Sequence, residues 1–137
     1  MASTTGRSVN RLVGTVFGAV YVLVGLLGFA VTSGVGLAAA EGEKLIVFEV
    51  NPLHNVVHLL VGVLLLLGSR SVASARAVNT TVGGVYLLVG LLGLFLVGTS
   101  FNILALNGAD NVLHLASAAL LLVVGLSQDR RPAAVHR

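Results

Sequence analysis

The residues best able to do chemistry are asparagine, histidine and aspartate side chains at the start of two apolar segments. NPLHNVVHLL begins at Asn51 and NGADNVLHLA begins at Asn107. Both stretches follow the pattern N-x-x-[HD]-N-x-x-H, whose members are Asn51, His54, Asn55, His58, Asn107, Asp110, Asn111 and His114. Spacings of three, four and seven residues share one helix face, so each stretch predicts a polar stripe.

The first turn of each stripe has the residue types of a helix cap. Asn51 precedes Pro52, a pair typical of an N-cap followed by proline at the first helical position. Asn107 precedes Asp110 by three residues, which suits an N-cap with an acid near the positive end of the helix dipole. We therefore expect these first-turn residues to be structural.

Capping cannot explain Asn55, His58, Asn111 and His114, which lie further along each helix. At about 1.5 Å per residue, each of the two histidines lies roughly 10 Å beyond its helix start. A polar group without partners in hydrocarbon costs several kcal/mol. We expect these four side chains to point into the bundle and to bond to one another, to Tyr21 and Tyr86, or to water.

Three interpretations of this polar cluster remain open. In the structural one, hydrogen bonds join the helices and His54 faces Asp110 as a charged pair. In the second, His58 and His114 face each other and bind a divalent metal or the iron of haem b; two histidines are few for zinc and suit axial haem ligation better. In the third, the histidines line a water-filled vestibule for a small ligand or proton, close to the outer face.

Composition places these elements in a membrane. The 137 residues are 56% hydrophobic and 9% charged, with a mean hydropathy of +1.01, whereas soluble proteins are about 25% charged. Four charge-free windows are each long enough for a spanning helix, and their solidly apolar runs exclude the alternation of a barrel strand. We predict an all-α integral membrane protein with helices at Leu12–Ser33, Pro52–Gly68, Ala77–Thr99 and Gly108–Leu126.

The basic residues predict the orientation. Of the eight lysines and arginines, only Lys44 falls on the side opposite the others, so both termini are expected in the cytoplasm. The pI of about 10.2 then reflects topology and anionic lipid headgroups, and implies no nucleic acid.

An internal repeat organises the chain. GAVYVLVGLLGF at Gly18–Phe29 recurs as GGVYLLVGLLGL at Gly83–Leu94, and the two polar stretches match as well. Such a copy argues against a cleaved leader at the N-terminus. We predict a tandem duplicated helical hairpin, a 2+2 arrangement with a parallel pseudo-twofold axis, in which the GVGLAAAEGEK stretch of the first outer loop is an insertion. The expected parts are a cytoplasmic tail (1–11), the first repeat (12–69), a cytoplasmic linker (70–76), the second repeat (77–127) and a basic tail (128–137).

Small residues on the odd-numbered helices predict contact faces. Their spacing puts them on one side of each helix, where glycine allows close approach between backbones in lipid. These helix-packing residues are Gly18, Tyr21, Gly25, Gly28, Gly83, Tyr86, Gly90 and Gly93.

The motifs also resemble a known family. NPLHNVVHLLVG, the VYLLVGLLG of the third predicted helix and NGADNVLHL are similar to the actinobacterial membrane-protein family called domain of unknown function 4383. The resemblance extends from about Leu12 to Leu126. It implies four transmembrane helices in a bacterial plasma membrane and implies no activity or catalytic residue.

The sequence favours a non-enzymatic function. It contains no nucleophile elbow, Walker loop or zinc-protease motif. We expect a scaffold or accessory subunit, without a cofactor, that packs against lipid and against a partner membrane protein or a second copy. The alternative is a haem- or metal-binding protein using His58 and His114, or a ligand or proton vestibule.

Overall fold

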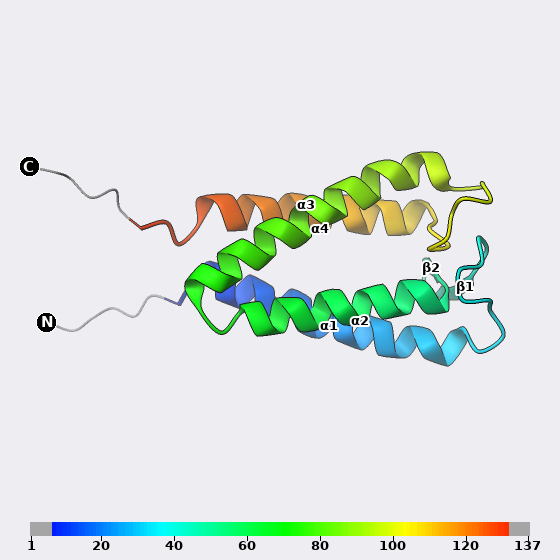
Figure 1. Ribbon diagram of the computed structural model, residues 1–137, viewed down its shortest axis with the longest axis horizontal. Coiled ribbons are helices and arrows are strands. Elements are labelled where there is room, and N and C mark those ends of the chain that lie inside the picture. Colours follow the sequence, from blue (N-terminus) through cyan, green and yellow to red (C-terminus); the bar gives the residue numbers. More distant parts are fainter. Residues whose placement is uncertain (1–6, 132–137) are drawn as a thin grey trace, which may run out of the picture.

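The computed structural model describes residues 7–131, which form four helices and one β-hairpin (Figure 1). The helices are α1 (Val9–Val31), α2 (Pro52–Gly68), α3 (Val72–Leu96) and α4 (Gly108–Ser127). Strands β1 (Glu43–Leu45) and β2 (Phe48–Val50) precede α2 and pair antiparallel, with Lys44 opposite Glu49. The prediction of a four-helix protein is confirmed. Helices α1, α3 and α4 are long and apolar enough to cross a membrane, while α2 has 17 residues and is shorter.

Two predicted helix starts were wrong, because a hydropathy criterion leaves out first turns that are helical but contain polar residues. Helix α1 begins at Val9 instead of Leu12, after the N-cap Ser8, and α3 begins at Val72 instead of Ala77, after the N-cap Ser71. Each serine side chain accepts a hydrogen bond from the backbone N–H three residues later. The predicted linker 70–76 therefore shortens to two residues, and the last part of the predicted tail 1–11 is helical. Residues 1–6 and 132–137 of the predicted tails lie outside the described residues.

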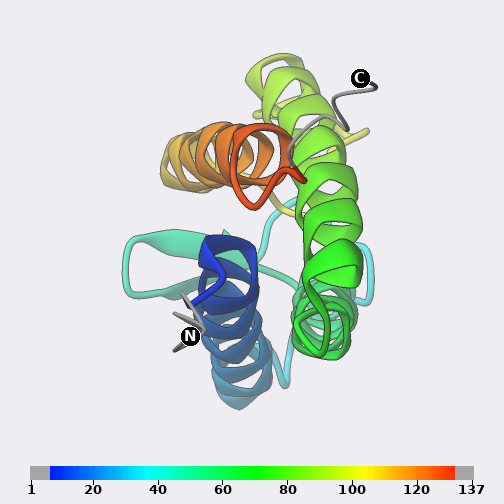
Figure 2. The same ribbon diagram turned by 90° about the vertical axis from the view of Figure 1, so that its left-hand side faces the viewer.

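The helices lie side by side in pairs. Helix α1 packs mainly against α2, and α3 mainly against α4; α3 runs obliquely and also contacts α1 and α2 (Figures 1 and 2). The described ends of the chain and the α2–α3 connection lie at one end of the bundle; the β-hairpin and the α3–α4 connection lie at the other (Figure 1). The predicted positions of both termini at one end agree with this arrangement.

The distribution of side chains is inverted relative to a soluble protein. Large apolar side chains cover the outside, with Phe95 at 80% exposed. The inside combines a small apolar cluster around Leu65, Tyr86 and Leu121 with many buried polar groups. Water would leave this apolar exterior unfavourably exposed, whereas lipid is a matching solvent for it.

The β-hairpin closes the bundle at the end where α2 and α4 begin. The backbone N–H of Glu49 donates to Asp110 Oδ2 at 3.1 Å, and Asn107 Nδ2 donates to the Val47 carbonyl at 3.0 Å. Within the hairpin, the Gly42 N–H donates to Glu49 Oε1 at 2.7 Å. The stretch predicted as an insertion thus contributes to an ordered cap that joins the α1–α2 side of the molecule to α4.

Candidate metal centre

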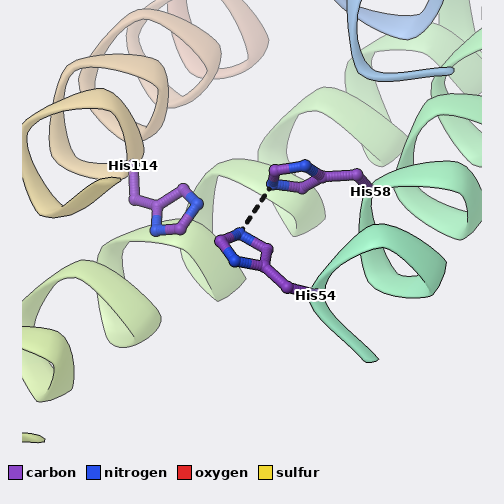
Figure 3. A group of neighbouring side chains, drawn as sticks. All are labelled: His54, His58 and His114. Atoms are coloured by element: carbon purple, nitrogen blue, oxygen red, sulfur yellow. Dashed lines mark hydrogen bonds between the residues drawn. The ribbon is translucent and has the colours of Figure 1, made fainter. Parts of the chain in front are cut away.

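Three histidines from two helices converge beneath this cap (Figure 3). His54 and His58 are four residues apart on α2 and therefore share a face, and His114 reaches toward them from α4. The Nε2 atoms of His54 and His58 are 3.1 Å apart. One ring nitrogen from each of the three imidazoles lies within 4.8 Å of the other two.

The three imidazoles are buried with most of their nitrogen atoms unpartnered. His54 is 1% exposed, and His58 and His114 are each 2% exposed. The His54–His58 contact uses one nitrogen from each ring, and the other four ring nitrogens of the trio have no hydrogen-bond partner. Because buried polar atoms are nearly always satisfied, these nitrogens are available to bind a ligand or water.

Two tyrosines line the trio. The Tyr86 ring stacks on His114 with ring centroids 5.1 Å apart, and the Tyr21 ring meets His58 edge-on at 5.2 Å. The Tyr21 hydroxyl hydrogen-bonds the Ser117 hydroxyl at 2.9 Å, which fixes its ring between α1 and α4. The sequence assigned both tyrosines to helix-packing faces and also named them as possible partners of the histidines; the structure places their rings against His58 and His114. Sequence reasoning missed Ser117 as a partner of Tyr21, because a lone serine between Ala116 and Ala118 forms no recognisable pattern.

The second pair of asparagines fits into glycine recesses. A Cβ atom at Gly28 would overlap the Oδ1 of Asn55, and a Cβ atom at Gly93 would overlap the Oδ1 of Asn111. Asn55 also donates to the Thr32 hydroxyl at 3.0 Å. Both asparagines are therefore held between helices and do not coordinate the histidine trio. Sequence reasoning missed Thr32, which lies at the end of α1.

The first-turn residues cap their helices. Asn51 Oδ1 accepts from the His54 N–H at 2.8 Å, and Asn107 forms a reciprocal capping box with Asp110. The expected ion pair between His54 and Asp110 is wrong: Asp110 Oδ2 instead accepts from the backbone N–H groups of Asn107 and Glu49. The Asp110 carboxylate is held by the cap of α4 and by the hairpin, and the His54 ring lies against His58 instead.

Of the sixteen residues that the sequence singled out in the two sets, fifteen are buried and Asn107 is half-buried. The glycines of the packing set lie against the neighbouring helix of the same pair. Gly18 and Gly25 face Leu66 and Leu59 on α2, while Gly83 and Gly90 face Leu122 and Leu115 on α4. The polar set divides into a histidine trio, two recessed asparagines and three capping residues.

A second polar cluster at the opposite end was not predicted. Asp129 Oδ2 accepts from the Ser8 hydroxyl at 2.7 Å, from the Asn10 N–H at 2.9 Å and from Asn10 Nδ2 at 3.0 Å. Asn79 Nδ2 donates to the Asn10 carbonyl at 3.0 Å. Partial burial alone would raise the pKa of Asp129, but these hydrogen bonds outweigh it and the pKa is lowered. The Asp129 carboxylate, just after α4, thus accepts hydrogen bonds from the first turn of α1, where the helix dipole favours a negative charge.

The trio has the composition of a transition-metal site. Neutral imidazole is a common ligand for Zn, Cu, Fe and Ni. Nitrogen ligands on one tetrahedral ion, with bonds of about 2.0–2.1 Å, lie roughly 3.3 Å apart. The 3.1 Å separation already matches this spacing, and the widest separation of 4.8 Å must shorten by roughly 1–2 Å.

Comparison with known proteins identifies a family for this chain but assigns it no activity. The family described as Domain of unknown function (DUF4383) matches residues 11–127, which confirms the resemblance seen in the sequence. No curated protein and no solved structure matches the chain.

Proposed function

Since the chain belongs to the family Domain of unknown function (DUF4383), whose description assigns no activity, we propose a function from the site itself. The protein is a non-enzymatic component of the plasma membrane that binds one transition-metal ion through His54, His58 and His114. The observation that supports this proposal is the convergence of three buried imidazoles, with one ring nitrogen of each within 4.8 Å of the other two. Metal binding would satisfy one nitrogen of each ring at a single point.

A bare ion suits this packing better than haem. A haem bound by His58 and His114 needs a flat macrocycle across the space between the two rings. Their centroids are 6.0 Å apart, and the His54 ring lies 4.4 Å from one and 5.7 Å from the other. The third imidazole therefore occupies the region that a porphyrin would need, and it supplies a third ligand to a small ion.

The membrane arrangement in this proposal is four spanning helices with both termini in the cytoplasm. Support comes from the basic residues and from the position of the described chain ends at one end of the bundle. The histidine end then lies toward the outer face. With 17 residues, α2 is about 25 Å long at 1.5 Å per residue, so its first turn lies at the interface.

We further propose that the chain is a duplicated helical hairpin. Matching residues of the two sequence repeats make matching contacts: Gly28 accommodates Asn55 as Gly93 accommodates Asn111. The glycine–leucine contacts within each helix pair correspond in the same way. Duplication would explain why each pair supplies imidazole to a shared interior.

A purely structural role is the second candidate. It is favoured by hydrogen bonds that join the helix pairs, including Tyr21–Ser117 and the donation from Asn51 Nδ2 to the Ile103 carbonyl at 2.8 Å. Such bonds contribute about 0.6 kcal/mol each in a membrane. In that case the protein is an accessory subunit or scaffold, and the unpartnered imidazole nitrogens bind water.

Metal analysis of the purified protein separates these functions. The full chain is purified in mild detergent, without a histidine tag, from cells supplied with haem and transition metals. We expect about one metal ion per chain by mass spectrometry and no Soret band. Each of His54→Asn, His58→Asn and His114→Asn should lose most of the metal while keeping the helical circular-dichroism spectrum. His136→Asn is the matched control, since His136 is the fourth histidine of the sequence.

The opposing outcomes are specific. A metal-free wild-type protein under these conditions would refute metal binding and leave the structural role. A Soret band that is lost on changing His58 or His114 would replace the bare ion with haem. Equal metal content in all four variants would mean that the metal binds elsewhere.

A further inference from the structure

Charge and coordination at the histidine trio select among transition metals. We propose that the ion is monovalent and of filled-shell type, Cu(I), held by three neutral imidazoles. This inference builds on the metal binding proposed above and names the class of ion that the same site takes.

The ligand set carries no negative charge. The sequence has no cysteine that could supply a thiolate. Both nearby carboxylates are engaged elsewhere: Asp110 Oδ2 accepts two backbone N–H bonds, and Glu49 Oε1 accepts from Gly42. Neither carboxylate is therefore placed as a direct ligand, and three neutral imidazoles do not reduce the charge of a bound ion.

Burial makes that charge expensive. The imidazoles are at most 2% exposed, and aromatic rings lie against them. The Born cost of placing an ion in a medium of low dielectric constant increases with the square of its charge, so a divalent ion costs about four times as much as a monovalent one. A divalent ion would need an added hydroxide or other anion, whereas a monovalent ion would not.

Asp110 offers one compensating charge. Among the described residues it is the only acidic side chain that is buried, and it lies four residues before His114 on α4. Residues at this spacing are neighbours on one helix face. One carboxylate balances one monovalent cation, so the interior becomes neutral when Cu(I) binds. Its Oδ1 atom is buried without a hydrogen-bond partner.

Coordination number points the same way. Zinc usually takes four ligands in proteins, and the chain offers three imidazoles at this point. Zinc held by three histidines keeps a fourth ligand such as water, whereas three nitrogen ligands are enough to complete the coordination of Cu(I). The Tyr21 and Tyr86 rings pack against His58 and His114, so aromatic rings line the site on two sides.

Competition with chromophoric chelators tests the choice of ion. The metal-free full chain in mild detergent is titrated with Cu(I) under reducing conditions and, separately, with Zn(II). We expect one Cu(I) per chain and a dissociation constant for Cu(I) at least about tenfold below that for Zn(II). Zinc binding that is as tight or tighter would overturn this inference while leaving metal binding intact. Failure of both ions to bind would refute both proposals.

Removing the compensating charge provides the second measurement. Asp110→Asn keeps an oxygen for the cap and should weaken Cu(I) binding by roughly tenfold. Asp129→Asn removes the same charge at the far end of the bundle and should leave Cu(I) affinity unchanged. Equal Cu(I) affinity for Asp110→Asn and wild type, with both folded, would contradict the charge balance on which the choice of ion depends.

Discussion

Glycines beside the polar residues show how single atoms determine this interior. Gly28 and Gly93 are the residues that leave room for the carboxamides of Asn55 and Asn111. Since the asparagines lie one turn before His58 and His114, the recesses also position the imidazoles. A methyl group in either recess must displace an asparagine or separate two helices.

Gly93→Ala should therefore destabilise the protein by about 1–3 kcal/mol, the usual cost of overpacking. The matched control is Gly84→Ala on the same helix, where an added Cβ meets no atom within 4 Å. The control should be neutral or stabilising by up to about 1 kcal/mol, because alanine favours helix over glycine. Thermal unfolding in detergent, followed by circular dichroism, compares the two; similar midpoints would mean that the recess is not needed.

The sequence predicted much of the site at this scale, because its spacing reveals helix faces. Asn55, His58, Asn111 and His114 were expected inside the bundle, where the structure has them. His54 was expected to face Asp110, and its position beside His58 and His114 was not predicted. The pairing of His54 with Asp110 looked favourable by charge, but the backbone N–H groups of Asn107 and Glu49 compete for that carboxylate. The Glu49 contact comes from a strand that has no strong pattern in the sequence.

At the scale of elements, helix ends with a strong cap signal were predictable and helix ends in charged segments were not. Helix α2 has the predicted bounds, with Asn51 and Pro52 at its start. Helix α3 begins five residues early, since Arg76 and its neighbours are compatible with helix although they are polar. The β-hairpin was missed because a three-residue strand gives too short a pattern to read.

Helix α1 begins in a contact with the end of the chain that follows α4, and this contact should depend on pH. The pKa of Asp129 is below its ordinary value, so its stabilising contribution is present above about pH 4, the unfolded value. That contribution is lost as the pH falls through the lowered folded pKa.

We expect Asp129→Asn to have a lower thermal unfolding midpoint than wild type at pH 7. The difference between the two midpoints should shrink as the pH drops below about 4, because the wild-type carboxylate then becomes protonated. Ser127→Ala is the control, because the exposed Ser127 hydroxyl donates to the Val123 carbonyl and accepts from Gln128 Nε2, and makes no hydrogen bond to Asp129 or α1. A difference between Asp129→Asn and wild type that stays constant from neutral to strongly acidic pH would contradict a role for the ionised carboxylate.

For the whole molecule, the arrangement of helix pairs determines which end faces the outside. The chain has no cysteine, so single cysteines can report accessibility. Ser100 lies in the α3–α4 connection, and Ala73 lies at the start of α3, at the opposite end of the bundle. Each is replaced by cysteine in turn, as Ser100→Cys or Ala73→Cys. Both positions are exposed.

In intact cells, a membrane-impermeant maleimide should label Ser100→Cys and leave Ala73→Cys unlabelled until the cells are permeabilised. This result follows from the excess of arginine at the end that carries the termini. The reverse pattern would place the histidine end in the cytoplasm. Labelling of both positions before permeabilisation would contradict a membrane between them.

The central claim is that imidazoles from both helix pairs meet on one ion. X-ray absorption spectroscopy of the metal-loaded protein tests it most directly, because imidazole rings give characteristic outer-shell scattering. We predict three nitrogen ligands from imidazole at about 2 Å in wild type, and two in His114→Asn if that variant retains metal. A first shell of oxygen atoms, or fewer than three imidazoles in the wild-type spectrum, would contradict the account.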